Sequence, residues 1–292
     1  MHGMEQTTTT TSSTETPRAR VGRRGGRKVA AVALTLVAAG ALAIGTTQQA
    51  APASADTGTA MPVGDVVQNG RTLHQSYAED FNTPANYGEV QWKYPQIATY
   101  NGERDTSGQG IYAPDKVLSV SNGNLDFWLH SENGQPLVAT VMPDGYEGIT
   151  TGRVSMRYKT TKTVGYKFVG MLWPVSDIWG EGEIDWPEGD LGSTVRPASA
   201  VPWSNLSGAM KFLPEQQMFA PQDQSEYHVV TTEWDYDHVS FYQDGQLVAS
   251  TTTAVPWTPM RATLQAETYI NQGAVPTSSD GHVDVDWISI WK

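Results

Sequence analysis

The chain has 292 residues, 10% of them aromatic, and a formal net charge of −12 at pH 7. This excess of acidic residues argues against nucleic acids and anionic membrane surfaces as partners, because both need basic patches. The chain has no cysteine, so an exported form must fold without disulfides, which its length allows.

Residues 1–55 have the features of a signal peptide in the usual order. Six Arg and Lys residues between positions 18 and 28 precede an apolar run over 29–45, and Ala53-Ser54-Ala55 supplies a small-x-small cleavage site. We therefore expect a secreted, extracellular protein without stable membrane association; the alternative is an N-terminal membrane anchor, for which the apolar run is at the lower limit of length. Cleavage would remove six of the 19 basic and two of the 31 acidic residues, leaving a formal net charge near −16. The sequence leaves open whether export follows the Sec or the twin-arginine route.

Residues 56–72 follow no clear hydrophobic period, and we interpret them as a short linker. From residue 73 to residue 292 short strands alternate with turns, which predicts a single domain over 73–292. Residues 117–121 and 125–129 flank Asn122-Gly123, a dipeptide that supplies the positive φ angles of a hairpin turn.

The second half of the chain continues this pattern. Residues 239–243 and 246–249 flank Asp244-Gly245 in a second predicted hairpin. Apolar and polar residues alternate over 154–158 and 283–290, as expected of strands, and we find no amphipathic helix of useful length. These features predict an all-β fold, an antiparallel β-sandwich or jelly roll.

Residues 192–222 interrupt the pattern of strands with four prolines, and Trp203 lies among them. A long irregular segment in a compact domain is often functional. We therefore expect a loop that borders the functional site.

The run from Gly182 to Gly189 is the most informative part of the chain, because it places Glu183, Asp185 and Glu188 within six residues. Side chains alternate along a strand, so Glu183 and Asp185 share a face while Glu188 is out of step. A β-bulge at Pro187 would return Glu188 to that face. The two glutamates would then be about 13 Å apart at Cα, close enough for their carboxyl groups to approach to about 5–6 Å, the separation of a retaining glycosidase.

Neighbouring acids in an acidic protein often form only a solvated surface. Here the run is bracketed by Trp173, Trp179 and Trp186, and it follows the apolar pair Met171-Leu172. Aromatic faces stack on sugar rings, and apolar neighbours indicate an element embedded in a sheet. This context favours a carbohydrate site.

At these residues the chain resembles glycoside hydrolase family 16, whose bulged active-site strand reads Glu-x-Asp-x-x-Glu, as in laminarinase-like members. The resemblance covers roughly residues 75 to 292 in the family's order, including 152–159, 172–174, 227–228, 233–234, 241–245 and 283–288. It implies a concanavalin A-like jelly roll of two curved sheets, with a substrate cleft across the concave face.

The resemblance also implies the role of each acid. Glu183 would be the nucleophile and Glu188 the general acid/base, while Asp185 would hydrogen-bond the nucleophile and help to separate the two pKa values. Close like charges are expected to keep Glu188 protonated near neutrality. The spacing alone does not say which glutamate attacks.

Four further residues are candidates for substrate binding. Trp173 and Trp179 are either sugar platforms or core residues, and Trp203 is a third candidate within the unplaced segment. Glu267 either reaches the cleft from a neighbouring strand or has a role at the surface or the core edge.

The histidines show no close metal-ligand spacing, so the sequence predicts no catalytic metal and no cofactor. Members of the family often hold a structural calcium, but the sequence identifies no ligands for one. Relatives often carry histidines after the active strand, whereas this chain has none between Asp190 and Tyr227.

Three functions remain open. The first is a retaining endo-hydrolase of a β-linked polysaccharide, with β-1,3-glucan favoured by the bulged signature. The second is a transglycosylase, or a hydrolase of another polysaccharide such as galactan or mixed-linkage glucan. The third is a non-catalytic, lectin-like sandwich, which would have no need of all three carboxylates. In each case we expect a monomer with a polysaccharide partner.

Overall fold

Strands make up most of the structure, a computed structural model that describes residues 58–204, 207–215, 224–269 and 273–292. These ranges all fall within one compact unit, Gln49–Lys292. The predicted signal peptide lies outside the described residues and stays a prediction. None of the helices that the structure describes is long and apolar enough to span a membrane.

Within the described ranges, the larger sheet has ten strands in the order β17-β16-β15-β10-β19-β7-β8-β5, with β3 paired to β19 and β6 paired to β7. Its pairs are antiparallel, except that β5 and β8 run parallel. The strands are β3 (Gln75–Glu79), β5 (Ile111–Tyr112), β6 (Leu118–Ser121), β7 (Asn124–Glu132), β8 (Gln135–Val138), β10 (Gly152–Thr160), β15 (His228–Trp234), β16 (Val239–Gln243), β17 (Gln246–Thr251) and β19 (Gly281–Trp291).

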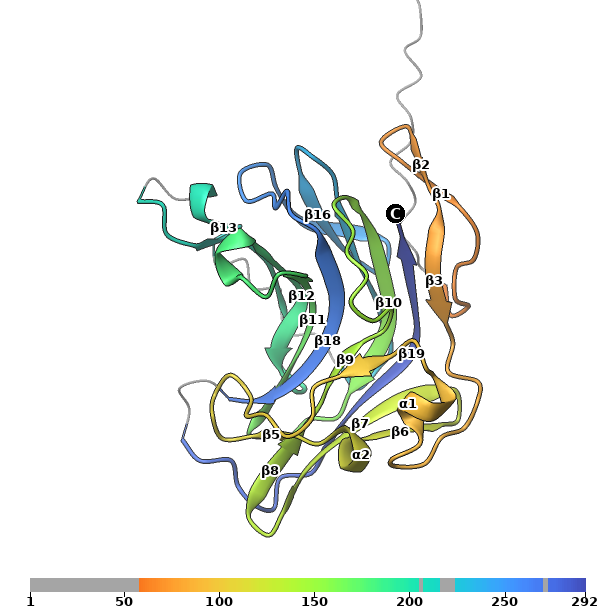
Figure 1. Cartoon of the computed structure of the whole chain (residues 1–292), viewed down its shortest axis with the longest axis vertical. Coiled ribbons are helices and arrows are strands. Elements are labelled where there is room, and N and C mark those ends of the chain that lie inside the picture. The colour runs from red at the N-terminus through yellow and green to blue at the C-terminus, as the bar shows by residue number, and fades with distance from the viewer. Residues whose placement is uncertain (1–57, 205–206, 216–223, 270–272) are drawn as a thin grey trace, which may run out of the picture. The chain divides into compact units, whose positions relative to one another are not determined.

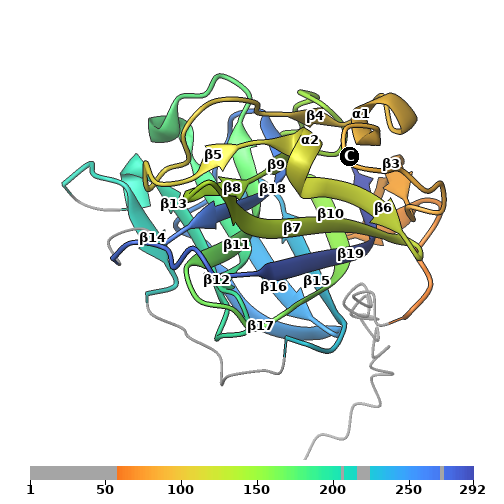
Figure 2. The same ribbon diagram turned by 90° about the horizontal axis from the view of Figure 1, so that it is seen from below.

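The second sheet has seven described strands, all antiparallel, in the order β14-β13-β12-β11-β18-β9-β4. It forms a layer beside the larger sheet (Figures 1 and 2), which confirms the predicted antiparallel sandwich. The strands are β4 (Ala98–Thr99), β9 (Thr140–Met142), β11 (Tyr166–Pro174), β12 (Glu183–Asp190), β13 (Arg196–Val201), β14 (Lys211–Leu213) and β18 (Met260–Thr268).

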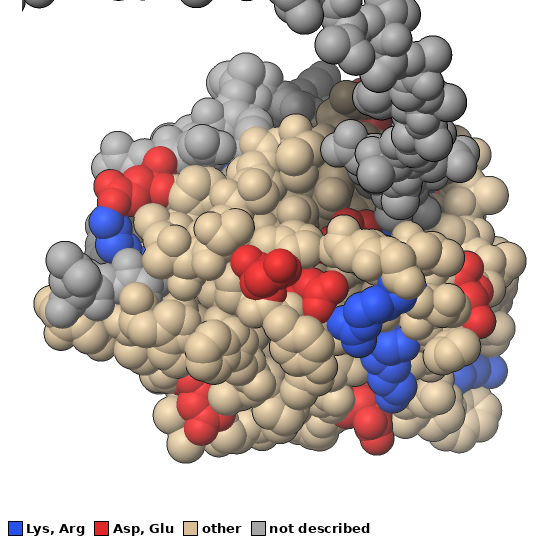
Figure 3. All heavy atoms as spheres, turned by 90° about the horizontal axis from the view of Figure 1, so that it is seen from above, with Lys and Arg blue, Asp and Glu red and all other residues tan. Residues whose placement is uncertain are grey.

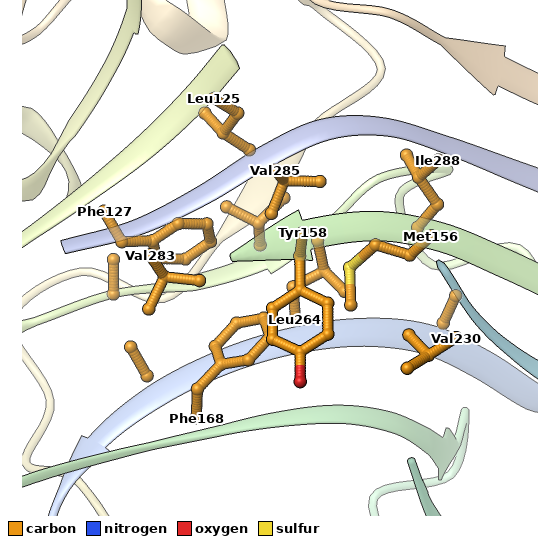
Figure 4. Close-up of a cluster of buried hydrophobic side chains, with 14 of the residues drawn as sticks. Leu125, Phe127, Met156, Tyr158, Phe168, Val230, Leu264, Val283, Val285 and Ile288 are labelled. Atoms are coloured by element: carbon orange, nitrogen blue, oxygen red, sulfur yellow. The ribbon is translucent and has the colours of Figure 1, made fainter. Parts of the chain in front are cut away.

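The hydrophobic core fills the space between the sheets (Figure 4). Phe127 from β7 and Tyr158 from β10 both pack on Phe168 from β11, with ring centroids 5.9 and 5.8 Å apart. Because strand side chains alternate between faces, the neighbours of Phe168 on β11 point to the opposite side of the smaller sheet. That opposite face carries the candidate site.

Both predicted hairpins are present, and each turn has the expected positive φ angles. Asn122 and Gly123 have φ of 52° and 75°, and Asp244 and Gly245 have φ of 46° and 78°. The helices are short, as the lack of amphipathic periodicity predicts. Those described are α1 (Val90–Lys93), α2 (Pro114–Val117) and the 3-10 turns η1 (Trp179–Glu181) and η2 (Pro202–Ser204).

The structure corrects the interpretation of residues 56–72 as a linker. Its described part forms a hairpin of β1 (Val66–Gln68) and β2 (Arg71–Leu73), beside the C-terminal end of β19 (Figure 1). The indole N–H groups of Trp287 and Trp291, both buried, donate to the carbonyls of Thr59 (3.1 Å) and Gly64 (2.8 Å). Short-range periodicity cannot reveal these contacts, because their partners lie at the other end of the chain.

The expectation of a loop over residues 192–222 is also corrected. This segment contributes β13 and β14, which extend the smaller sheet beyond β12. The strand β13 escapes pattern analysis because it is built mainly from small residues that are buried on both faces, so apolar and polar positions do not alternate. Residues 205–206 and 216–222 of the segment lie outside the described ranges.

Charged side chains on the face shown in Figure 3 form small groups in which Lys and Arg lie near Asp and Glu. No broad basic patch is visible on that face.

Candidate active site

A β-bulge in β12 brings the three acidic side chains onto one surface. On β11, Met171 pairs with Asp185 and Val169 pairs with Glu188, so two steps along β11 match three along β12. The same mismatch occurs against β13. This confirms the bulge predicted at Pro187, which returns Glu188 to the face of the other two acids.

The residue of β11 that lies between these two pairs is Gly170, and its lack of a side chain makes the bulge possible. A Cβ atom there would lie 2.7 Å from the carbonyl oxygen of Trp186 and 3.1 Å from Cδ of Pro187. Such a contact is too close for any other residue without a shift of the bulged backbone. Gly170 is therefore a packing requirement of the active strand.

The three acids line a cavity of about 810 Å³ on the face of the smaller sheet that points away from the core. The predicted cleft is therefore present. Its walls include loop residues that precede β5 and side chains from the β-strands, and its aromatic lining consists of Tyr100, Tyr112, Trp173, Trp179 and Phe212.

Glu183 is half-buried at the start of β12 and accepts a hydrogen bond from the indole N–H of Trp179 at 2.5 Å. Burial raises the pKa of Glu183 to about 7; the hydrogen bond from Trp179 opposes this rise, and the charge of Glu188 adds to it. Near neutrality the Glu183 carboxyl group is therefore poised between its two protonation states.

Asp185 is only 2% exposed. Burial raises its pKa well above the ordinary range, and the charges of Glu183 and Glu188 raise it further. Its buried Oδ1 atom has no hydrogen-bond partner among the described residues. A neutral Asp185 can donate a hydrogen bond, which an ionised one cannot.

Glu188 lies between two cations. The Nζ atom of Lys167 on β11 is 3.5 Å from one carboxylate oxygen, and Nη2 of Arg196 on β13 is 2.5 Å from the other. Both oxygens of Glu188 therefore face a cation, whereas Glu183 receives a hydrogen bond from a neutral indole. Both cations come from the strands on either side of β12, so the local sequence of the acidic run could not reveal them.

Glu267 reaches the cavity from β18, as one of the two alternatives from the sequence has it. Its carboxylate lines the cavity but is 1% exposed. One oxygen accepts hydrogen bonds from the backbone N–H and the hydroxyl of Thr106 and from the hydroxyl of Tyr112, while the other lies 3.2 Å from Lys167. With both oxygens occupied, Glu267 holds Lys167 in place beside Glu188.

Of the three predicted tryptophans, Trp173 and Trp179 line the cavity and Trp203 does not. The indole N–H of Trp173 donates to Asp177 at 3.2 Å. Asp177 also accepts from the buried guanidinium of Arg261 at 2.6 Å. These contacts fix the wall around Trp173.

Lys167 and Arg196 also belong to the site, although neither was predicted from the sequence. A signal for Lys167 was present, because its parity on β11 matches that of Trp173. Arg196 gave no such signal, since its strand was expected to be a loop. Tyr100 and Thr106 reach the site only through long-range packing.

A metal role has no support from the described side chains. Among them, no group of three or more His, Asp or Glu residues is arranged to hold a metal ion. None is therefore assigned to the structural calcium that related proteins often hold.

Comparison with known proteins adds a family and a fold. The family model described as "Glycosyl hydrolases family 16" matches residues 106–289. The glucan endo-1,3-beta-glucosidase A1 of Niallia circulans is 25% identical over 261 residues, which cover 77% of this chain but only 36% of that protein. The chain thus corresponds to about a third of this relative's length.

Solved structures of low sequence identity share the fold. SCLam, described as a non-specific endo-beta-1,3(4)-glucanase from family GH16, superimposes with a TM-score of 0.61 at 18% identity, covering 82% of this chain and 96% of SCLam. The laminarinase from Rhodothermus marinus gives a TM-score of 0.61 at 15% identity, with coverage of 76% and 99%.

The contact between Trp179 and Glu183 generates a testable prediction. In Trp179→Phe the pKa of Glu183 should rise further, by about 1, because a hydrogen bond to the ionised carboxylate is lost. A ¹³C NMR titration of the Glu183 carboxyl carbon measures this change. Trp173→Phe is the matched control, since Trp173 donates to Asp177 instead. An unchanged or lower pKa in Trp179→Phe would contradict the assignment.

Proposed function

The chain belongs to glycosyl hydrolases family 16, and on this basis we propose that it is a secreted, retaining endo-glycosidase that cleaves a β-1,3-linked glucan. The observation that carries the proposal is the placement of Glu183, Asp185 and Glu188 on one surface of a cavity with an aromatic lining. The name of the Niallia circulans relative supports a β-1,3-glucan as substrate. Secretion rests on the leader-like residues 1–55.

In the proposed mechanism, Glu183 attacks the anomeric carbon while Glu188 gives a proton to the departing glycosidic oxygen. Glu188 then takes a proton from the water that hydrolyses the glycosyl-enzyme. The reacting complex thus needs an ionised Glu183 and a protonated Glu188. Burial raises the pKa of Glu183 to about 7 in the substrate-free protein, so the reacting complex must favour the ionised form of Glu183.

Arg196 is placed to change partners when substrate binds. The side chain of Arg196 is 44% exposed, so it is free to turn from Glu188 towards a sugar hydroxyl when the cavity fills. This movement would leave Lys167 as the ion-pair partner of Glu188. Asp185, buried on the same face, is placed to hydrogen-bond Glu183 as Glu183 becomes ionised.

The charges of the cavity favour a neutral polysaccharide. Seven acidic and three basic residues line it, and the chain without residues 1–55 is strongly acidic. A polyanionic chain would meet net repulsion there. A neutral glucan meets none and can stack on the aromatic lining.

The alternatives are different reactions of the same site. A mixed-linkage glucan has support from the description of SCLam as an endo-beta-1,3(4)-glucanase. Transglycosylation, galactan hydrolysis and lectin-like binding rest on no specific observation here. The protein is proposed to act as a monomer.

The two glutamates can be told apart by azide rescue. Glu183→Ala should lose hydrolysis of laminarin, because no glycosyl-enzyme forms; with azide and an activated aryl β-laminaribioside it should give the α-glycosyl azide. Glu188→Ala should still form the glycosyl-enzyme from the aryl glycoside, and azide should convert it to the β-glycosyl azide. NMR of the isolated azides assigns their configuration.

The reverse pattern of products would exchange the roles of the two glutamates. Unaltered activity of both variants on laminarin, lichenan, agarose and xyloglucan would mean that the acidic run is not the catalytic site. Binding of these polysaccharides by the unaltered protein without release of reducing ends would favour the lectin-like alternative.

Gly170 should be required for activity more than for folding. In Gly170→Ala the added methyl group pushes the Trp186 carbonyl and the bulge away from β11, so Glu188 moves relative to Glu183. Because misplacement by about 1 Å can cost about 100-fold, we expect kcat on laminarin to fall by roughly that factor. Steady-state kinetics with a circular dichroism spectrum test this.

Gly180→Ala is the matched control, because a Cβ atom at Gly180 meets nothing within 4 Å. It should keep the activity of the unaltered protein. Equal activity of Gly170→Ala and Gly180→Ala would show that the bulge tolerates the added methyl group and that its packing does not set the geometry of the acids.

A further inference from the structure

Two large indole rings lie exposed and side by side on the surface outside the cavity. The ring centroids of Trp203 in η2 and Trp257 in the connection from β17 to β18 are 5.2 Å apart, with an angle of 34° between the planes. The two residues are 47% and 64% exposed. Exposed apolar surface of this kind often marks a binding site.

The indole pair is tied to the segment that leads into the active strand. Trp203 follows β13 closely, and on that strand Ala200 pairs with Glu183. On the other side, the Trp257 connection packs on the same segment: a Cβ atom at Gly182 would lie 2.8 Å from Cβ of Pro256. The pair therefore adjoins the Glu183 end of the active strand.

The hydroxyl of Thr258 adds a second tie, since it donates to the backbone carbonyl of Glu181 at 3.2 Å. Within the same short segment, Trp179 is 49% exposed, lines the cavity and contacts Glu183. Trp179 is thus an exposed indole at the cavity. Trp203 and Trp257 lie on the elements that pack against the turn that contains Trp179. The segment from Trp179 to Gly182 therefore links the cavity wall to the elements that carry the indole pair.

We propose that Trp203 and Trp257 form an additional sugar-binding platform, which holds pyranose rings of the polysaccharide outside the catalytic cavity. The proposal rests on the proposed function, because it takes the same neutral glucan as its ligand. Trp203 was predicted as a substrate contact but does not line the cavity. As part of this platform it would bind the polysaccharide at a distance from the reaction.

The chemistry of the pair selects this ligand over other occupants. An indole ring offers a broad apolar face with a polar edge, which matches the C–H face and the hydroxyl rim of a pyranose. Two indole rings are far smaller than the roughly 800 Å² that each partner contributes to a standard protein–protein interface. The packing of these elements against the segment that carries Trp179 favours the same polysaccharide that we propose for the cavity.

A platform outside the cavity contributes to the binding of long chains only. We therefore expect Trp203→Ala, Trp257→Ala and the double variant to bind laminarin more weakly, by about 10-fold for the double variant. Turnover of a short aryl β-laminaribioside, which fits within the cavity, should keep its kcat and KM.

Affinity gel electrophoresis with laminarin in the gel measures binding without hydrolysis, when each variant is made in the Glu183→Gln background. Trp92→Ala is the matched control, since Trp92 lies on α1 and is 74% exposed. It should be retarded by laminarin as strongly as its Glu183→Gln parent. The Trp203 and Trp257 variants should be retarded less.

Three outcomes would overturn the proposal. In the first, laminarin retards the Trp203 and Trp257 variants as strongly as Trp92→Ala, or it does not retard even the Glu183→Gln parent, which is the second. In the third, the variants lose turnover of the short aryl glycoside as much as they lose binding of laminarin. A concentration-dependent dimer that disappears in the double variant would assign the pair to self-association instead. Reduced retardation of these variants without any hydrolysis by the unaltered protein would uphold the platform while the proposed catalysis fails.

Discussion

The close approach of the bulged segment of β12 to Gly170 is the constraint on which the rest of the site depends. A regular strand would carry Glu188 to the core face, where an acidic side chain would have no partner. The extra residue keeps Glu183, Asp185 and Glu188 together over the cavity. The bulge in turn exists only because β11 has no side chain at the point of contact.

The neighbouring strands then determine how charge is distributed over the three acids. Lys167 and Arg196 flank Glu188, and Glu267 holds Lys167 through a carboxylate fixed by loop residues that precede β5. Glu183 instead receives a neutral indole N–H. The substrate-free site is therefore asymmetric. Two cations lie beside Glu188, whereas burial is the largest influence on the pKa of Glu183. Arg196 therefore contacts a proposed catalytic group as well as forming part of the cavity wall.

Local sequence is sufficient for features that depend on a few consecutive residues. The two tight turns, the alternation along the strands and the bulge at Pro187 could all be predicted this way. The partners of Glu188 could not, because they depend on which strands lie beside β12 and in what register. The role of residues 58–72 was hidden for a related reason: their carbonyl groups meet Trp287 and Trp291, more than 200 positions away in the chain. Glu267 was correctly placed at the cleft, but its hydrogen bonds to Thr106 and Tyr112 depend on long-range packing and could not be predicted.

The central claim is that two carboxyl groups on one bulged strand act as nucleophile and acid/base in a double displacement. The stereochemical course of hydrolysis tests it most directly. Proton NMR of laminarin hydrolysis in the first minutes should show the β-anomer at each new reducing end, with the α-anomer appearing only as mutarotation proceeds. An α-anomer formed first would mean inversion, and would contradict a covalent intermediate on either glutamate.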